Sequence, residues 1–117
     1  MNEQVLDLDE FLERVQDDKD LLVELLDIFV GDYLEKRKLM GEAVTKKDFE
    51  TIKSISHSLK GASGNISAKA LRESFIKFEQ ISKNNDLTGA AELLTGMDKQ
   101  FSELTHKISA VKKEFGK

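Results

Sequence analysis

The sequence predicts an all-α protein: an antiparallel up-down four-helix bundle with a short extra helix at its N-terminus. Two observations carry this prediction. The 117 residues include no proline and only seven glycines, which suits a chain that is helical almost throughout, because proline breaks helices. Apolar residues also recur at steps of three and four, and no strand-like alternation is found. We expect one domain, residues 1–117, with a core large enough to need no crosslinks.

Periodicity and helix-breaking residues divide the chain into five helices. The first is short, over about residues 8–15, and Asp7 and Glu10 have the spacing of a capping box there. Asp48 is the expected N-cap of the third helix. Loops of two to four residues between the long helices favour antiparallel neighbours. The long helices are expected over residues 20–44, 48–65, 67–84 and 86–115.

The last helix has the most regular pattern in the chain. Its apolar residues alternate steps of three and four without interruption, and they are Leu87, Ala90, Leu94, Met97, Phe101, Leu104, Ile108, Val111 and Phe115. This heptad seam is typical of helices that pack at a shallow angle. A seam this regular could extend to a second chain, but we expect a monomer.

Composition and charge exclude several classes of function. The chain has no cysteine, so it forms no disulfide and no thiolate metal site. A formal net charge of −4 argues against nucleic acid as a partner, because binding to phosphates needs a basic surface. No apolar run approaches membrane-spanning length, and the N-terminus lacks a signal pattern. We therefore expect no membrane insertion and a cytoplasmic location.

His57 is the most informative residue, because the helical pattern turns it away from the core. At ~100° of rotation per residue, the apolar residues of the third helix share one face, and His57 lies roughly opposite. Lys53, Lys60, Gly61 and Gly64 lie on the same stripe as His57. The ring is therefore expected to be exposed, open to close approach and flanked by groups that attract anions.

These neighbours suit a nucleophile that accepts phosphate. A neutral imidazole nitrogen can act as the nucleophile, and Lys60 would place an ammonium beside the phosphoryl group. Gly61 and Gly64 each cost about 1 kcal/mol relative to alanine in a helix, which indicates a steric reason for them. A helix end would explain Gly64 but not Gly61. The spacing alone leaves a phosphoacceptor and an ordinary surface histidine equally open.

Residues 57–68, His-Ser-Leu-Lys-Gly-Ala-Ser-Gly-Asn-Ile-Ser-Ala, resemble the signature of histidine-containing phosphotransfer (HPt) domains. That signature reads His-x-Leu-Lys-Gly-x-Ser/Ala. The resemblance extends over about residues 20–110 and includes Phe78-Glu79. It departs at Ser67-Ala68, where family members usually have Gly-Ala. Because serine is a good N-cap, we expect the turn to survive this change.

The resemblance implies a histidine phosphotransfer module of a multistep two-component phosphorelay, which carries a phosphoryl group on His57 between receiver-domain aspartates. Lys60 would balance the phosphoryl charge, and Gly61 would leave room for the partner's active site. Lys53 and Gly64 would contribute to partner binding. The partners implied are receiver domains of response regulators or hybrid histidine kinases. The receiver would bring Mg²⁺, so this domain would need no cofactor or metal of its own and would have no autonomous kinase activity.

Two alternatives within the same resemblance remain open. The domain could be the N-terminal phosphoacceptor domain of a chemotaxis-type histidine kinase, phosphorylated by a separate ATP-binding domain. It could also be a non-catalytic helical module that docks a receiver without turnover. The other histidine, His106, lies two positions from each of two seam residues and is expected to be an ordinary surface residue.

Overall fold

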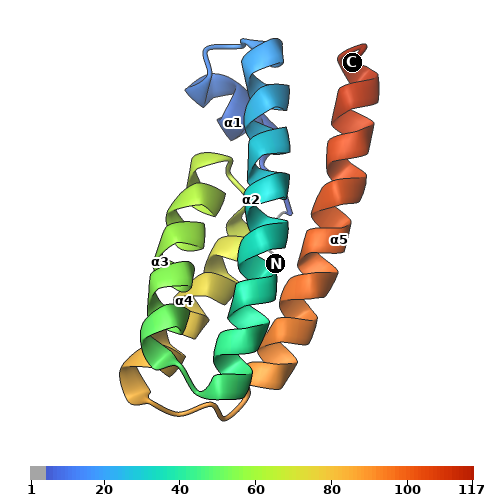
Figure 1. Ribbon diagram of the computed structural model, residues 1–117. Coiled ribbons are helices and arrows are strands. Elements are labelled where there is room, and N and C mark those ends of the chain that lie inside the picture. The colour runs from blue at the N-terminus through green and yellow to red at the C-terminus, as the bar shows by residue number, and fades with distance from the viewer. Residues whose placement is uncertain (1–4) are drawn as a thin grey trace.

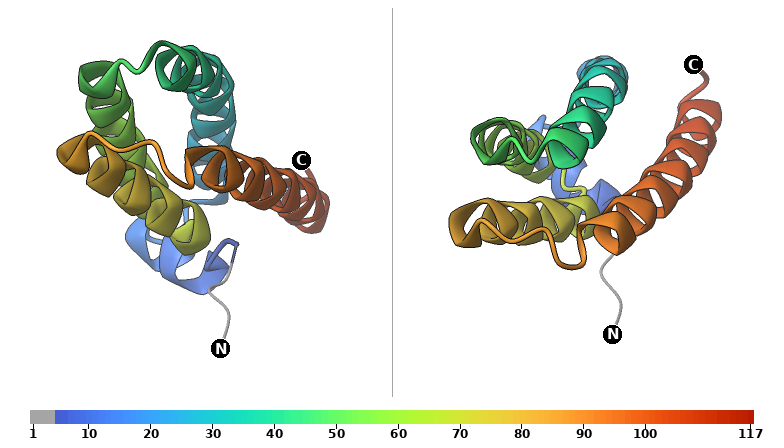
Figure 2. Two further views of the ribbon diagram at one scale, coloured as in Figure 1. Left: turned by 90° about the horizontal axis from the view of Figure 1, so that it is seen from below. Right: turned by 60° about the horizontal axis from the view of Figure 1, so that its bottom comes forward.

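Four long helices surround one core, and a short helix covers one end of it (Figure 1). The computed structural model describes residues 5–117. Neighbouring long helices run in opposite directions, and the end-on views place α3 diagonally from α5 (Figure 2). The predicted up-down bundle with an extra N-terminal helix is confirmed. The helices are α1 (Leu8–Arg14), α2 (Lys19–Lys46), α3 (Phe49–Asn65), α4 (Lys69–Asn84) and α5 (Ala90–Glu114).

Aspartate side chains begin the first three helices. Asp7, Asp18 and Asp48 each accept a hydrogen bond from the backbone N–H three residues later, at 3.1, 3.0 and 3.1 Å. These bonds satisfy backbone donors that have no partner within the helix. The expected Asp48 cap is confirmed. The capping box at α1 is only half formed, because the Glu10 carboxylate accepts from the Ser67 hydroxyl instead.

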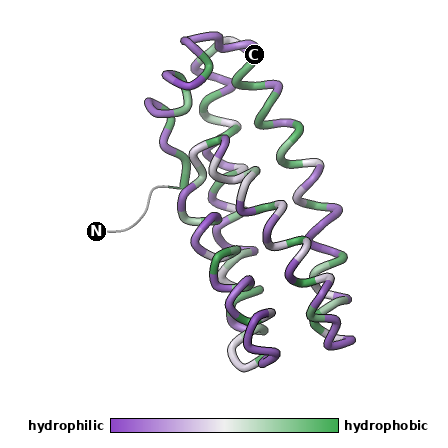
Figure 3. The backbone as a smooth tube through the Cα atoms, turned by 90° about the vertical axis from the view of Figure 1, so that its left-hand side faces the viewer, coloured by the Kyte–Doolittle hydropathy of each residue, from purple (hydrophilic) through white to green (hydrophobic). Residues whose placement is uncertain are grey.

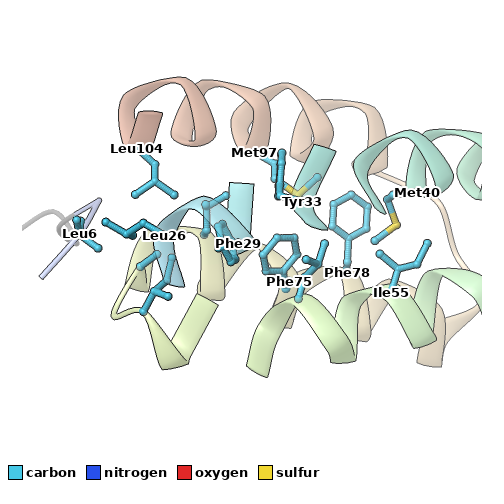
Figure 4. Close-up of a cluster of buried hydrophobic side chains, with 14 of the residues drawn as sticks. Leu6, Leu26, Phe29, Tyr33, Met40, Ile55, Phe75, Phe78, Met97 and Leu104 are labelled. Atoms are coloured by element: carbon cyan, nitrogen blue, oxygen red, sulfur yellow. The ribbon is translucent and has the colours of Figure 1, made fainter. Parts of the chain in front are cut away.

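The apolar faces meet in a core that is rich in aromatic side chains (Figure 4). Tyr33 of α2 stacks on Phe101 of α5 with ring centroids 3.9 Å apart, and it also lies 6.4 Å from Phe75 of α4. Leu6 closes the end of the cluster towards Leu26 (Figure 4). Hydrophobic residues recur among hydrophilic ones along the helices (Figure 3), and the buried ones follow the predicted helical spacing. No helix within residues 5–117 is both long enough and apolar enough to cross a membrane.

The heptad seam of α5 packs against α2 and α4 of the same chain. The seam residues Ala90, Met97, Leu104, Ile108 and Val111 are buried, and the other four are partly buried. An ion pair reinforces the contact with α2 at the edge of the seam: the Arg37 guanidinium donates to both Asp98 carboxylate oxygens, at 2.7 and 2.9 Å. The seam is therefore covered within one chain.

The fifth helix begins later than the sequence predicts. Residues 86–89 form a turn instead of the first helical turn. The Asp86 carboxylate accepts hydrogen bonds from the backbone N–H and the hydroxyl of Thr88, at 3.0 and 2.7 Å. Gly89 then has a φ of +81° and becomes the N-cap of α5. The predicted start at Asp86 is wrong because its side chain bonds two residues ahead, which forms a turn and not a helix cap.

Ser67 is also placed differently from the expectation that it caps the fourth helix. It follows the end of α3 and has a left-handed φ of +61°. Its N–H bonds to the Gly64 carbonyl, and the Ala68 N–H bonds to the Ser63 carbonyl, which together form a Schellman motif. Ala68 is the N-cap of α4 and makes no side-chain cap. A glycine would adopt this conformation without strain.

Ser67 attaches α1 to the turn between α3 and α4. Its hydroxyl donates to Glu10 at 2.8 Å, and its carbonyl accepts from the Asp7 N–H at 3.0 Å. The ammonium of Lys69, at the start of α4, lies 2.9 Å from the same Glu10 carboxylate. Phe11 is fully buried beneath these polar contacts. As a result, α1 is fixed beside the last turn of α3.

Two substitutions at Ser67 separate its backbone strain from its hydrogen bond. We expect Ser67→Ala to lower the free energy of unfolding by about 1 kcal/mol, because the bond to Glu10 is lost and the strain stays. Ser67→Gly also loses the bond but relieves a left-handed conformation, so it should be more stable than Ser67→Ala by about 1 kcal/mol. Urea denaturation of both variants measures the difference. Equal stability of the two variants would contradict the strain.

Candidate functional site

His57 lies on the outer face of α3, as predicted. Ile52, Ile55 and Leu59 on the same helix are buried in the core. These residues fix the rotation of α3 about its axis, so the residue on the opposite side points to solvent. The His57 side chain is 76% exposed. An external group can therefore reach the ring without any rearrangement of the bundle.

The Glu79 carboxylate of α4 holds the Lys60 ammonium beside the His57 ring. Lys60 Nζ lies 2.6 Å from Glu79 Oε1, and His57 Nδ1 lies 3.8 Å from Glu79 Oε2. The second distance is too long for a hydrogen bond but short enough for electrostatic attraction. The Lys60 ammonium holds the pKa of Glu79 below its usual range, so the carboxylate is ionised at neutral pH. The Glu79 side chain is only 19% exposed, which keeps this geometry defined.

A second lysine lies on the α2 side of the histidine. Lys36 donates to the hydroxyl of Ser58, the residue after His57, at 2.6 Å. It also pairs with Asp32 on its own helix at 3.1 Å. A lysine is thus held on each side of the α3 outer face, one by a residue of α4 and the other by residues of α2 and α3.

The two glycines near His57 have different surroundings. A Cβ atom at Gly61 would meet no atom within 4 Å, so packing within the described chain gives no reason for glycine there. A Cβ atom at Gly64 would lie 3.4 Å from Cδ of Arg72, whose side chain extends over this position from α4. Gly61 therefore leaves the surface one turn from His57 open, whereas Gly64 makes room for a neighbouring side chain.

The remaining predicted site residue, Lys53, and the second histidine, His106, lie on different sides of the bundle. Lys53 is exposed and lines a shallow hollow with His57 on α3. His106 is exposed on α5, diagonally across the bundle, and its Nδ1 lies 2.9 Å from the Ser102 carbonyl oxygen. His106 is therefore a surface histidine away from the site, as expected. Within residues 5–117, no group of three or more histidine, cysteine, aspartate or glutamate side chains could hold a metal ion.

Sequence reasoning gave no role to Glu79 or Lys36. The usable signal for Glu79 was its place on α4, next to the apolar stripe of Phe75 and Phe78. An acidic residue at such an edge is half-buried and needs a cationic partner from the next helix. The sequence offers no comparable signal for Lys36, because its contact with Ser58 depends on how far α2 and α3 slide along each other.

The chain was then compared with known proteins. Residues 24–114 match the sequence model of the Hpt domain. Among solved structures, the chain is similar to histidine-containing phosphotransfer protein B (HptB) from Pseudomonas aeruginosa PAO1. The two are 25% identical with a TM-score of 0.86, and the match covers 97% of this chain and 98% of that one. The search of curated proteins gave no match. Since the family match spans most of the chain and includes α3 and α4, the chain belongs to the Hpt domain family, the histidine phosphotransfer domains of phosphorelays.

Proposed function

We propose that His57 is the phosphoacceptor, and that the domain carries the phosphoryl group between aspartates of receiver domains. The observation that carries this proposal is the exposed ring on the outer face of α3, with Lys60 and Glu79 in contact beside it. Membership of the Hpt family supports the same role. No other histidine of the described residues lies near such a charge pair; His106 bonds only to its own helix.

The geometry favours Nε2 as the attacking atom. Glu79 lies on the Nδ1 side of the ring, and an ionised carboxylate there stabilises the tautomer with its proton on Nδ1. Nε2 then keeps its lone pair and attacks the phosphorus of a receiver aspartyl phosphate. The N–P bond forms as the bond from phosphorus to the aspartate oxygen breaks, and the aspartate leaves as a carboxylate. The Nδ1 proton stays on the ring, where Glu79 offsets the developing positive charge.

Lys60 can exchange its partner, from the Glu79 carboxylate to the phosphoryl group on His57. A phosphoryl group carries about −1.5 to −2 charges at neutral pH, more than the single charge of Glu79. It therefore competes with the carboxylate for the ammonium once it reaches the ring.

We propose that the receiver supplies Mg²⁺ and that this domain has no cofactor of its own.

Receiver domains of response regulators or hybrid histidine kinases are the proposed partners. Lys53 and Gly64 flank His57 on the docking face. We further propose that the protein acts as a monomer, because α2 and α4 of the same chain cover the α5 seam. A cytoplasmic location, expected from the sequence, is part of this proposal.

The direct test is phosphate transfer to the wild-type domain and to His57→Gln from a panel of phosphorylated receivers. The wild type should acquire an acid-labile, base-stable label, and the variant should acquire none, because glutamine has no nucleophilic ring nitrogen. Equal labelling of both proteins would refute the proposal. Label obtained only from a separate ATP-binding domain would instead favour the kinase-fed alternative, and receiver binding without any label would favour a docking module.

Gly61→Gln tests whether the open surface beside His57 serves the partner. The variant should fold with equal or greater stability, because helix propensity improves by up to about 1 kcal/mol, yet transfer should slow at least tenfold because the partner is held away. Gly96→Gln is the matched control: Gly96 is also helical with nothing within 4 Å of its Cβ position, but it lies on α5. Thermal unfolding and transfer rates are measured for both. Equal rates in the two variants would show that access at Gly61 is not needed.

Lys60→Ala, Glu79→Gln and the double variant show how the charge pair acts. Lys60→Ala should slow transfer without abolishing it, because the ring remains. If Glu79 acts only by holding Lys60, Glu79→Gln should have no further effect in the Lys60→Ala background. We expect an additional severalfold loss there, because Glu79 also faces His57 Nδ1. Single-turnover rates of the four proteins measure this coupling. If Glu79→Gln causes no additional loss in the Lys60→Ala background, Glu79 does not act on His57 directly.

A further inference from the structure

A cleft adjoins the open surface beside His57. Three helices, α1, α3 and α4, line this open cleft of about 530 Å³ next to Gly61. Four basic and two acidic side chains line it, in a chain whose net charge is −4. This volume lies within the ~300–1,000 Å³ of typical ligand pockets. The charged lining residues are Arg14, Lys60, Lys69, Arg72, Glu10 and Glu73.

Most of the basic groups in the cleft are already paired. Lys60 bonds to Glu79, while Lys69 and Arg14 share the Glu10 carboxylate at 2.9 and 3.3 Å. Lys69 also lies 3.4 Å from the Asp7 carboxylate. Within residues 5–117, Arg72 is the exception among the four, because its side chain makes no ion pair and no hydrogen bond, and neither does that of the neighbouring Glu73. The Arg72 side chain lies over Gly64, so it extends from α4 to the edge of the α3 outer face. The cleft therefore presents an unneutralised guanidinium close to the docking face.

We propose that this cleft receives a carboxylate-bearing segment of the receiver domain docked over His57, and that Arg72 binds the carboxylate. The inference rests on the proposed function and names the surface that selects the partner. Two observations favour a receiver segment as the occupant: the cleft is continuous with Gly61, one turn from His57, and the unpaired guanidinium of Arg72 on its wall complements a carboxylate. A guanidinium binds a carboxylate through two parallel hydrogen bonds, which gives directional recognition.

The position of the cleft points to selection of the partner and not to chemistry. One wall is α1, which lies before residue 24, where the match to the Hpt family begins. Ser67 and Lys69 hold that wall in place through Glu10. The phosphoryl site of His57, Lys60 and Glu79 lies inside the matched span. The other two walls, on α3 and α4, lie inside that span and carry Lys60 and Arg72. The cleft therefore borders the reacting groups but does not include the His57 ring.

Charge reversal at Arg72 tests the inference. Arg72→Glu should lower the transfer efficiency from the receivers that wild type prefers by about tenfold, as expected for a charge-assisted hydrogen bond replaced by repulsion. Lys77→Glu is the matched control, because it makes the same charge change at an exposed position of α4 on the side towards α5. It should change the efficiency less than twofold. Circular dichroism and thermal unfolding confirm that both variants are folded.

Binding of each receiver to His57→Gln, with and without Arg72→Glu or Lys77→Glu, is measured by calorimetry at low and high salt. If Arg72→Glu weakens binding and Lys77→Glu does not, and the effect is largest at low salt, the result supports the cleft even if no phosphate is transferred. If Arg72→Glu and Lys77→Glu, each in the protein that keeps His57, accept phosphate equally well, the proposed role of the cleft is wrong and the proposed function stands. If the wild type neither binds nor accepts phosphate from any receiver, both the cleft and the proposed function are wrong.

Discussion

The burial of one face of α3 is the constraint on which the site depends. Ile52, Ile55 and Leu59 are held in the core, and α4 packs more closely against α3 than any other helix does. Truncating a buried aliphatic side chain of this kind to alanine costs about 2–5 kcal/mol, so α3 cannot rotate about its axis without a large loss. The exposure of His57 on the opposite face is thus set by the core. No contact of the ring itself is needed to hold it outward.

The same packing determines where the charges lie. Phe75 and Phe78 anchor α4, which leaves Glu79 at the edge that faces α3, within reach of Lys60. Because the pKa of Glu79 is lowered by this contact, its stabilising effect is present above the ordinary pKa of a glutamate and is lost as the pH falls through the lowered value. The pair therefore stays intact across neutral pH. A change in the rate of transfer over that range does not come from loss of this pair.

Periodicity and helix caps were sufficient to predict the bundle and the outward histidine, because both depend on residues close in sequence. The Asp48 cap and the α5 seam are of this kind. The prediction failed where the outcome depends on backbone conformation that a residue type does not indicate. Ser67 gives no sign of its left-handed φ, since that conformation is held by Schellman bonds and by contacts with α1. The ion pair between Lys60 and Glu79 could not be predicted from the local sequence pattern either, because it depends on which edge of α4 meets α3.

The residues that we propose act on a partner contribute little to folding, and this separation has a physical origin. His57 and Gly61 project from the face of α3 that the core does not use, and Arg72 lies on an exposed edge of α4. Substitutions at such positions usually change stability by less than about 0.5 kcal/mol. A change at Ile55 or Phe75, in contrast, alters the packing that positions every one of them. Substitutions at these surface positions can therefore change the proposed partner contacts without loss of the fold, provided that the buried face of α3 is retained.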